Sequence, residues 1–450
     1  MKKFLIVLLS LGLIAAFSMT ASAADVKFSG SYYVVGVYDN NDALADNDLA
    51  PSRAFFFQRV RLEPVFQIAE GLTFTTRMDA LEKQWGSLNW RTIGGGGQDS
   101  PSSRPSTGGA GSLAQENIEF ERSNVTFKTA IGTFVVGYQG FFNWGTVFQD
   151  FSDNDNTTAR ILYINTVGPV TLLAFYDKFI EADTSAGLIG LTDADISNYA
   201  LAGIYSFKNG NAGLLYYYFN IATPRPGGLR INWHYLAPYV KATFGPVYVE
   251  SEVIYMTGKT KFEAPLAGVA DVDTNAWSAY LLAKANLGPA HVGAQVGWVS
   301  GDDGSDPTKN DASLNTGTGW NPALILMNDD LNNWKGRTGA NTANSGKGNI
   351  LLYNIFGGFN PTPKINVESA LTYAEVDKIP AAAAVNKNES KKLGIELDIT
   401  ASYKIYDNLT YMVGAGYLWT GDAFKGYGAG SNANVVGIDY LLMNKLSLSF

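Results

Sequence analysis

The chain contains no cysteine among its 450 residues, so it can form no disulfide framework and has no thiolate chemistry. Histidine is almost as scarce, because His234 and His291 are the only two and lie far apart in the sequence. Neither has partners at the spacing of metal ligands, and no histidine-carboxylate set points to acid/base catalysis. We therefore expect no metal site, no cofactor and no enzymatic activity.

A long apolar run is also missing, since no stretch of about 18 apolar residues follows the first 23 residues. Yet hydrophobic residues make up 46% of the chain, aromatic residues 13%, and glycines number 48. This mixture suits a transmembrane β-barrel, in which half of each strand faces lipid and half faces water. The net charge of −8 argues against nucleic-acid binding, and no linker divides the chain into domains.

The amino terminus has the features of a secretory signal peptide. Lys2 and Lys3 precede an apolar run over residues 4–17, and a cluster of small residues follows. The apolar run is too short for a membrane anchor, and the small residues form a cleavage site. We expect a signal peptide over residues 1–23 and a single mature domain over residues 24–450.

The last strand-like segment alternates between apolar and polar residues. A period of two sends the two sets to opposite faces of a strand. An uncovered apolar face is unfavourable for an edge strand in water, but it suits a closing strand in lipid. Segments 289–299, 392–404 and 409–419 alternate in the same way. In the final segment the apolar set is Val436, Ile438, Tyr440, Leu442, Leu446, Leu448 and Phe450, opposite Gly437, Asp439, Lys445, Ser447 and Ser449.

Short turns alternate with longer polar loops along the whole mature chain. The turns contain the residues that tight turns require, and two alternating segments and one long loop separate each turn from the next. Eight turns and nine loops predict an all-β, antiparallel transmembrane barrel of about 18 strands, with 16 as the alternative. The turns lie at 70–71, 131–133, 168–169, 209–211, 245–246, 288–289, 361–363 and 406–408, and the loops near 39–52, 86–115, 141–157, 183–195, 222–230, 259–273, 302–348, 378–390 and 421–433.

One expected strand, 116–129, changes parity along its length. Ile118 and Phe120 share one parity, whereas Val125 and Phe127 share the other. A β-bulge near residues 121–123 would return all four side chains to one face.

Charged residues on early strands are expected to line the barrel interior. An arginine on the lipid face costs about 2–4 kcal/mol at mid-depth, so each arginine should face water. These side chains either set the selectivity of the pore or merely pair with acidic neighbours such as Glu119, and the sequence leaves both interpretations open. The set is Arg59, Arg61, Glu63, Arg77, Asp79, Arg122, Lys128 and Arg160.

The third long loop, residues 141–157, is unusually aromatic for an exposed loop. An apolar loop needs a surface to pack on, and the inner wall of the barrel provides one. With the strand-like stretch 132–139 before this loop and the terminal aromatic Phe450, the mature chain resembles the bacterial outer-membrane porins of the general diffusion type.

The resemblance implies a water-filled channel in the Gram-negative outer membrane for passive diffusion of ions and small hydrophilic solutes. It also implies that loop 141–157 folds inward, with Asp150, Asp153 and Asp155 opposite the arginines. Phe450 would be the signal read by the barrel assembly machinery. The remaining implied partners are outer-membrane lipid and two further copies of the chain in a homotrimer.

Loop 302–348 departs from the porin pattern because it is the longest connection, and loops beyond about 15 residues are usually functional or disordered. Its middle, 322–331, could form a short helix that caps the mouth, dips into the lumen or covers a neighbouring subunit. This loop favours a substrate-specific channel as one alternative. A barrel sheath around a partner in a secretion or electron-transfer assembly is another. The acidic external loops predict a weak cation preference.

Overall fold

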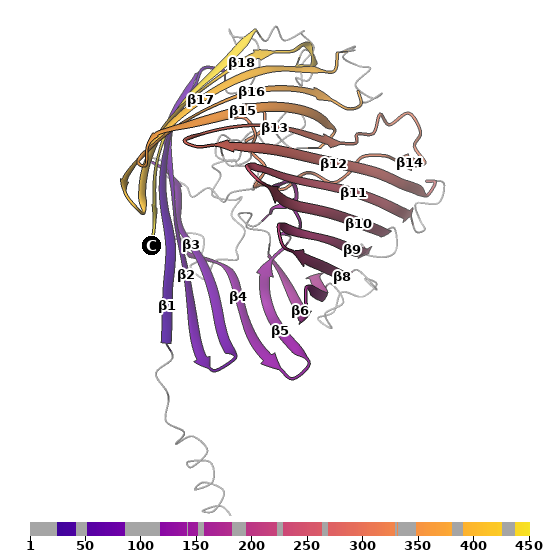
Figure 1. Cartoon of the computed structure of the whole chain (residues 1–450). Coiled ribbons are helices and arrows are strands. Elements are labelled where there is room, and N and C mark those ends of the chain that lie inside the picture. Colours follow the sequence, from indigo (N-terminus) through magenta and orange to yellow (C-terminus); the bar gives the residue numbers. More distant parts are fainter. Residues whose placement is uncertain are drawn as a thin grey trace, which may run out of the picture.

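The computed structural model describes residues 25–41, 52–85, 118–141, 143–151, 157–181, 195–222, 228–262, 269–328, 331, 348–379, 390–424 and 437–450. The expected signal peptide lies outside these residues. The described chain forms one sheet of 18 long antiparallel strands, and the sheet closes because β1 pairs with both β2 and β19 (Figure 1). In the part of the chain described, no helix has the length and apolar character needed to cross a membrane.

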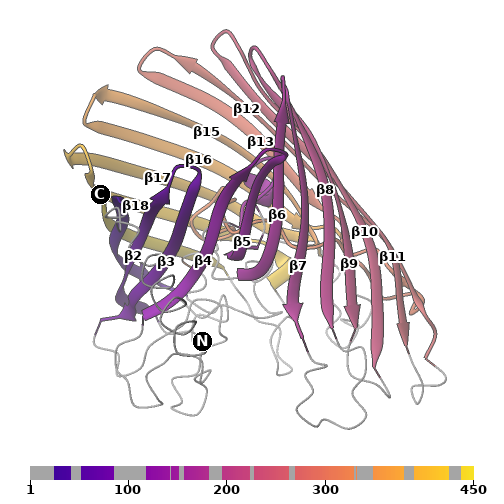
Figure 2. The ribbon, with the colours of Figure 1, turned by 90° about the horizontal axis from the view of Figure 1, so that it is seen from below.

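Each long strand pairs with the strands before and after it in the chain, so the wall is a simple up-and-down barrel (Figure 2). A further two-residue strand, β14 (Lys309–Asn310), lies in the connection between β13 and β15 and pairs in parallel with β12. The long strands are β1 (Asp25–Asp39), β2 (Arg53–Ala69), β3 (Leu72–Gln84), β4 (Ile118–Thr129), β5 (Gly132–Gly140), β6 (Thr157–Val167), β7 (Val170–Ile180), β8 (Ile196–Phe207), β9 (Gly210–Ala222), β10 (Leu229–Phe244), β11 (Val247–Phe262), β12 (Val272–Leu287), β13 (Ala290–Val299), β15 (Ile350–Thr362), β16 (Ile365–Val376), β17 (Lys392–Tyr406), β18 (Leu409–Thr420) and β19 (Ile438–Ser449).

The predicted rhythm of connections is confirmed, and with it the strand number of 18 rather than 16. All eight expected tight turns join consecutive strands, within one or two residues of their expected positions. The two ends of the barrel therefore differ, because one carries only short turns and the other carries the long connections.

The two faces of each strand have opposite character. Large apolar side chains on the outer parity are exposed, with Phe120 at 68% and Leu201 at 62%. Val35 and Leu215, on the inner parity, are each only 1% exposed. A soluble protein rarely leaves so much contiguous apolar surface in water, whereas a hydrocarbon solvent favours it.

Several strand pairs show register shifts, and three of these shifts involve residues that face the barrel interior. The pairing of β3 with β4 skips Glu121, which confirms the bulge expected near 121–123. A second bulge lies in β3, where Leu81 has a φ of 53° and Arg59 faces two residues rather than one. A third interrupts β17 at Leu393: the alternation expected over 392–404 puts this apolar residue on the lipid face, but its side chain joins the buried interior cluster instead.

The closing seam of the barrel joins the first and last strands. β1 and β19 pair from Ser31 opposite Ser449 to Asp39 opposite Leu441. Gly30 and Phe450 extend the ladder, with N···O distances of 2.8 and 3.0 Å. A Cβ at Gly30 would lie 2.5 Å from the backbone oxygen of Arg61 and 2.7 Å from the Phe450 ring, so glycine is required beside the terminal aromatic ring.

In the long connection between β13 and β15, residues 322–328 are not helical, so the short helix expected over 322–331 is wrong there, whereas Leu331 has a helical backbone. The side chains of Ile325, Leu326 and Met327 are at most 1% exposed. The backbone N–H groups of residues 324–326 donate to side chains of the barrel wall instead of to carbonyl groups one turn earlier, and this replaces the helical pattern.

Candidate functional site

The inner face of β2, β3 and β4 carries a network of charged side chains centred on Asp79. The carboxylate of Asp79 is fully buried and accepts a hydrogen bond of 2.7 Å from Nε of Arg61. Arg59 and Arg77 approach the same carboxylate at 3.9 and 4.0 Å. Charge-assisted, two-pronged contacts such as that of Arg61 are strong and fix the geometry of the guanidinium group.

Further acidic groups surround the network. Arg59 lies 3.7 Å from Glu82, and Arg77 lies 3.9 Å from Glu63 and 3.8 Å from Glu121. Both bulges serve this arrangement, since the bulge at Leu81 turns Glu82 inward and the one at Glu121 adds an interior carboxylate. Bulges often re-aim side chains in this way.

Arg122 and Arg160 extend the basic surface beyond this network. Arg122 stands directly opposite Arg77 across the β3–β4 pair. Nε and Nη2 of Arg160 donate to the two carboxylate oxygens of Asp177 at 2.6 and 2.8 Å. The hydroxyl of Tyr217 donates to the same carboxylate at 2.8 Å, so Arg160 is held rigidly against β7 and β9. The basic wall therefore runs from β2 to β6.

The structure separates other predicted site residues from this wall. Lys128 is exposed and lies beside the short turn at Gly71, at the opposite end of β4 from Glu121. Asp150 lies in the third long loop, where Gly319 donates to its backbone oxygen at 2.8 Å. Asp153 and Asp155 fall outside the described residues.

Residues 143–151 of the third long loop, here the third-loop segment, lie against the inner face of β10, β11 and β12. Trp144 donates its indole N–H to the carbonyl oxygen of Ala237 at 2.8 Å. The backbone and hydroxyl of Thr146 both donate to Glu252, at 2.9 and 2.8 Å. Phe148 is fully buried and stacks on Tyr280 at a centroid distance of 5.1 Å.

Residues 316–327 of the long connection, here the long-loop segment, contact β13, β15 and β17. Trp320 is 2% exposed and donates its indole N–H to Gln295 at 2.9 Å. Asn354 donates to the carbonyl oxygen of Pro322 at 3.2 Å. The backbone N–H groups of residues 324–326 donate to Asp398 and Glu396.

The two segments and the basic wall occupy different arcs of the barrel. β3 is the third strand around the wall and β12 is the twelfth of 18, so they stand half a turn apart. The contacts of the two segments fall on β10–β13, β15 and β17, whereas the arginines stand on β2, β3, β4 and β6. The interior is thus charged on one side and filled by inward chain on the other.

Several interior acidic residues were not singled out from the sequence as site residues. Glu82, Asp177, Glu252 and the pair Glu396 and Asp398 all bind arginines or inward segments. For all of them except Glu82, which a bulge turns inward, the position in the two-residue period is the signal that could have found them. Glu252, for example, alternates with the outward Val253, which is 38% exposed.

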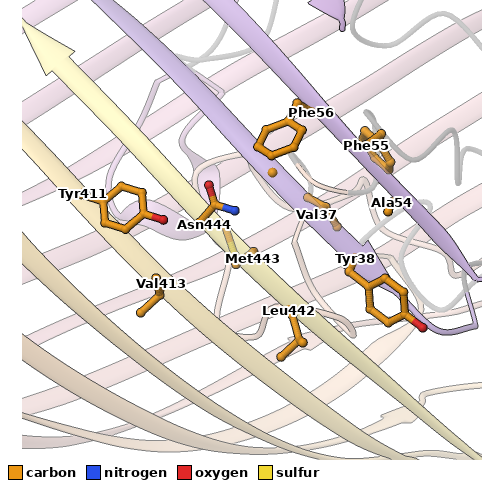
Figure 3. A pocket seen from close by; sticks show the side chains of 11 residues that line it. Val37, Tyr38, Ala54, Phe55, Phe56, Tyr411, Val413, Leu442, Met443 and Asn444 are labelled. Carbon is orange, nitrogen blue, oxygen red and sulfur yellow. The ribbon is translucent and has the colours of Figure 1, made fainter. Parts of the chain in front are cut away.

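A pocket also lies on the outer face, away from this interior site. It has a volume of about 430 Å³ and is bordered by β1, β2, β18 and β19 (Figure 3). Its walls include the exposed side chains of Phe56, Tyr411 and Leu442. Asn444 contributes a carboxamide beside Gly36, an unusual polar group on a face expected to meet lipid.

Solved outer-membrane channels have a similar fold. The chain is similar to OccK2 (OpdF) of Pseudomonas aeruginosa in complex with glucuronate, at 12% identity and a TM-score of 0.52, covering 95% of this chain and 98% of that one. It is also similar to OccD3 (OpdP) of Pseudomonas aeruginosa, at 10% identity and a TM-score of 0.52, covering 96% and 93%. No protein-family description and no curated protein sequence matches the chain. At these identities the likeness establishes the barrel fold and nothing finer.

Proposed function

We propose that this protein is an outer-membrane channel for passive diffusion of ions and small hydrophilic solutes. The observation that carries the proposal is the division of the interior of a closed 18-strand barrel. A charged wall on β2–β6 faces inward chain segments on the opposite arc, and a barrel of this size encloses an aqueous path unless its lumen is fully plugged.

The outer face supports a membrane location. Exposed leucine, isoleucine, valine and aromatic side chains cover the outer parity of the strands, and hydrocarbon is the solvent in which such a surface is stable. Export by the expected signal peptide and insertion by the barrel assembly machinery, with Phe450 as its signal, belong to the same proposal. Separation of inner and outer membranes from expressing cells should place the protein in the outer-membrane fraction.

The third-loop segment is proposed to narrow the pore, with the long-loop segment narrowing it further. Two constricting segments favour a channel that discriminates between solutes over one that passes all small molecules. Each of Arg59, Arg61, Arg77 and Arg160 has a carboxylate within 4.0 Å, so the wall carries little uncompensated charge. We therefore expect weak ion selectivity, with a small cation preference from the net charge of −8.

Swelling of liposomes that contain the refolded protein tests this function. The liposomes should swell in solutions of small sugars, and the rate should fall as the sugar becomes larger than the constriction. A folded barrel in liposomes that do not swell in any sugar would contradict the proposal and favour a barrel that holds a partner protein.

We further propose that three copies of the chain associate through the outer face of β18, β19, β1 and β2. Asn444 supports this choice, because a carboxamide in hydrocarbon lacks the hydrogen-bond partners that a protein neighbour can provide. The adjoining pocket of about 430 Å³ can receive a side chain of the neighbouring copy.

A further inference from the structure

Buried carboxyl groups lie at the points where the inward segments meet the barrel wall. Glu252 of β11 is 1% exposed and accepts both hydrogen bonds of Thr146. Glu396 of β17 is fully buried, and its two carboxylate oxygens accept the backbone N–H groups of Ile325 and Leu326 at 2.6 and 2.7 Å. Each segment is therefore held by acceptors from a strand far away in the sequence.

The long-loop segment has a second carboxyl group at its anchor. Asp398, two residues after Glu396 on the same inward face, accepts the backbone N–H of Leu324 at 3.2 Å. Three consecutive backbone donors thus meet two adjacent carboxyl groups. Among the described residues, neither Glu396 nor Asp398 has an ion-pair partner, so the segment itself provides their principal donors.

The two segments also bind each other. The backbone N–H groups of Gly317 and Gly319 donate to the carbonyl oxygens of Phe148 and Asp150, each at 2.8 Å. The ring of Phe148 contacts the ring of Trp320 at a centroid distance of 5.0 Å. These contacts join the two segments into one body with an anchor at each side, on β11 and on β17.

We propose that Glu252 and the Glu396–Asp398 pair are positioning residues that hold the two segments as a single constriction body, so that loss of either anchor widens the pore. The proposal rests on the proposed channel function for its effect on conductance. Its structural part, the release of one segment when the anchor of the other is lost, is independent of that function.

Thiol labelling tests the structural part directly, because the chain has no native cysteine. Ile325→Cys places a thiol at a fully buried position of the long-loop segment, and Leu314→Cys, at a position 36% exposed in the same connection, serves as the labelled reference. In otherwise unchanged protein, a maleimide should label Cys at 325 slowly and Cys at 314 rapidly. Leaving a buried donor without its acceptor shifts the equilibrium away from the seated state by roughly tenfold to hundredfold.

Glu396→Gln and Glu252→Met are then combined separately with Ile325→Cys; methionine replaces Glu252 because a glutamine amide oxygen could accept both hydrogen bonds of Thr146. Each should raise the labelling rate at position 325 by roughly tenfold or more, although Glu252 touches only the third-loop segment. Glu368→Gln is the matched control, since Glu368 stands on β16, is near His291 and has no described contact with either segment. A rate that rises with Glu396→Gln but not with Glu252→Met would overturn the single body, and unchanged rates in both would overturn the anchors.

Conductance in planar bilayers provides the second readout. Both anchor variants should give larger single-channel steps than the parent protein and the Glu368→Gln control. Heat-modifiable migration in detergent gels confirms that each variant is a folded barrel before it is compared. Conducting variants with parental step sizes would contradict the anchors, whereas an absence of conductance in every protein together with altered labelling would contradict the channel function and leave the anchors supported.

Discussion

Asp79 is the residue that keeps the basic wall compensated. From a fully buried position its carboxylate lies within 4.0 Å of three arginines. Removing one member of a buried charged group leaves its partners uncompensated, which typically costs about 3–5 kcal/mol. The same substitution also changes the charge that a passing ion meets.

We predict that Asp79→Asn shifts the reversal potential in a salt gradient toward anion preference and lowers the urea midpoint of unfolding. The reason is that Arg59, Arg61 and Arg77 then carry an unbalanced positive charge. Asp273→Asn is the control, because Asp273 is exposed and pairs only with Lys259 at 3.2 Å. An unchanged reversal potential would mean that permeating ions do not pass this wall.

The strained backbone of Leu81 leads to a second prediction about a single residue. Its φ of 53° is in the left-handed region, which costs an ordinary residue about 1–2 kcal/mol and a β-branched residue more. Leu81→Gly should therefore fold with equal or higher stability, whereas Leu81→Val should lower the urea midpoint. The reverse order would show that side-chain packing, rather than backbone strain, dominates at this bulge.

At the scale of elements, the long-loop segment differs from an ordinary external loop. Trp320 packs edge-on against both Phe148 and Tyr280, with ring centroids 5.0 and 5.9 Å away. We predict that Trp320→Ala increases single-channel conductance and its open-state noise, because removing a buried tryptophan typically costs about 3–5 kcal/mol of local packing. Trp298→Ala, which removes an outward tryptophan bonded to Asp377, should leave the step size unchanged.

At the same scale, some features of the fold can be predicted from the sequence and others cannot. Strands, turns and the bulge at Glu121 were predictable because each depends on neighbouring residues, through the two-residue period and turn chemistry. The bulge at Leu81 was not, since leucine gives no sign of a left-handed backbone. The binding of residues 324–326 to the barrel wall could not be predicted either, because their hydrogen-bond acceptors lie about 70 positions later in the chain.

In the candidate site, too, the sequence predicts some features and not others. Asp79, Arg61 and Arg160 were placed on the inner wall because charge is excluded from the lipid face. Their partners were harder to predict, since Glu82 faces inward only through a bulge and Asp177 meets Arg160 through strand register. Parity alone was not enough for Lys128. It predicts which face of the strand a residue occupies but not its position along the strand, and Lys128 lies far along β4 from the other basic residues.

At the scale of the whole molecule, association through β18, β19, β1 and β2 makes a separate prediction. Asn444→Leu should fold normally but shift the protein from trimer to monomer in native gels, because the proposed contact loses its polar group. Leu201→Ala, an outward change on β8 where the side chain is 62% exposed, is the control. A trimer that survives Asn444→Leu unchanged would place the subunit contact elsewhere on the outer face.

Our central proposal for the whole molecule is that water and ions cross the lumen of the barrel, between the charged wall and the inward segments. Single-channel recording of the refolded mature protein in a planar bilayer, with a salt gradient, tests it most directly. We predict stable conductance steps and a small reversal potential whose sign corresponds to cation preference. Silence from protein shown to be a folded barrel would contradict it.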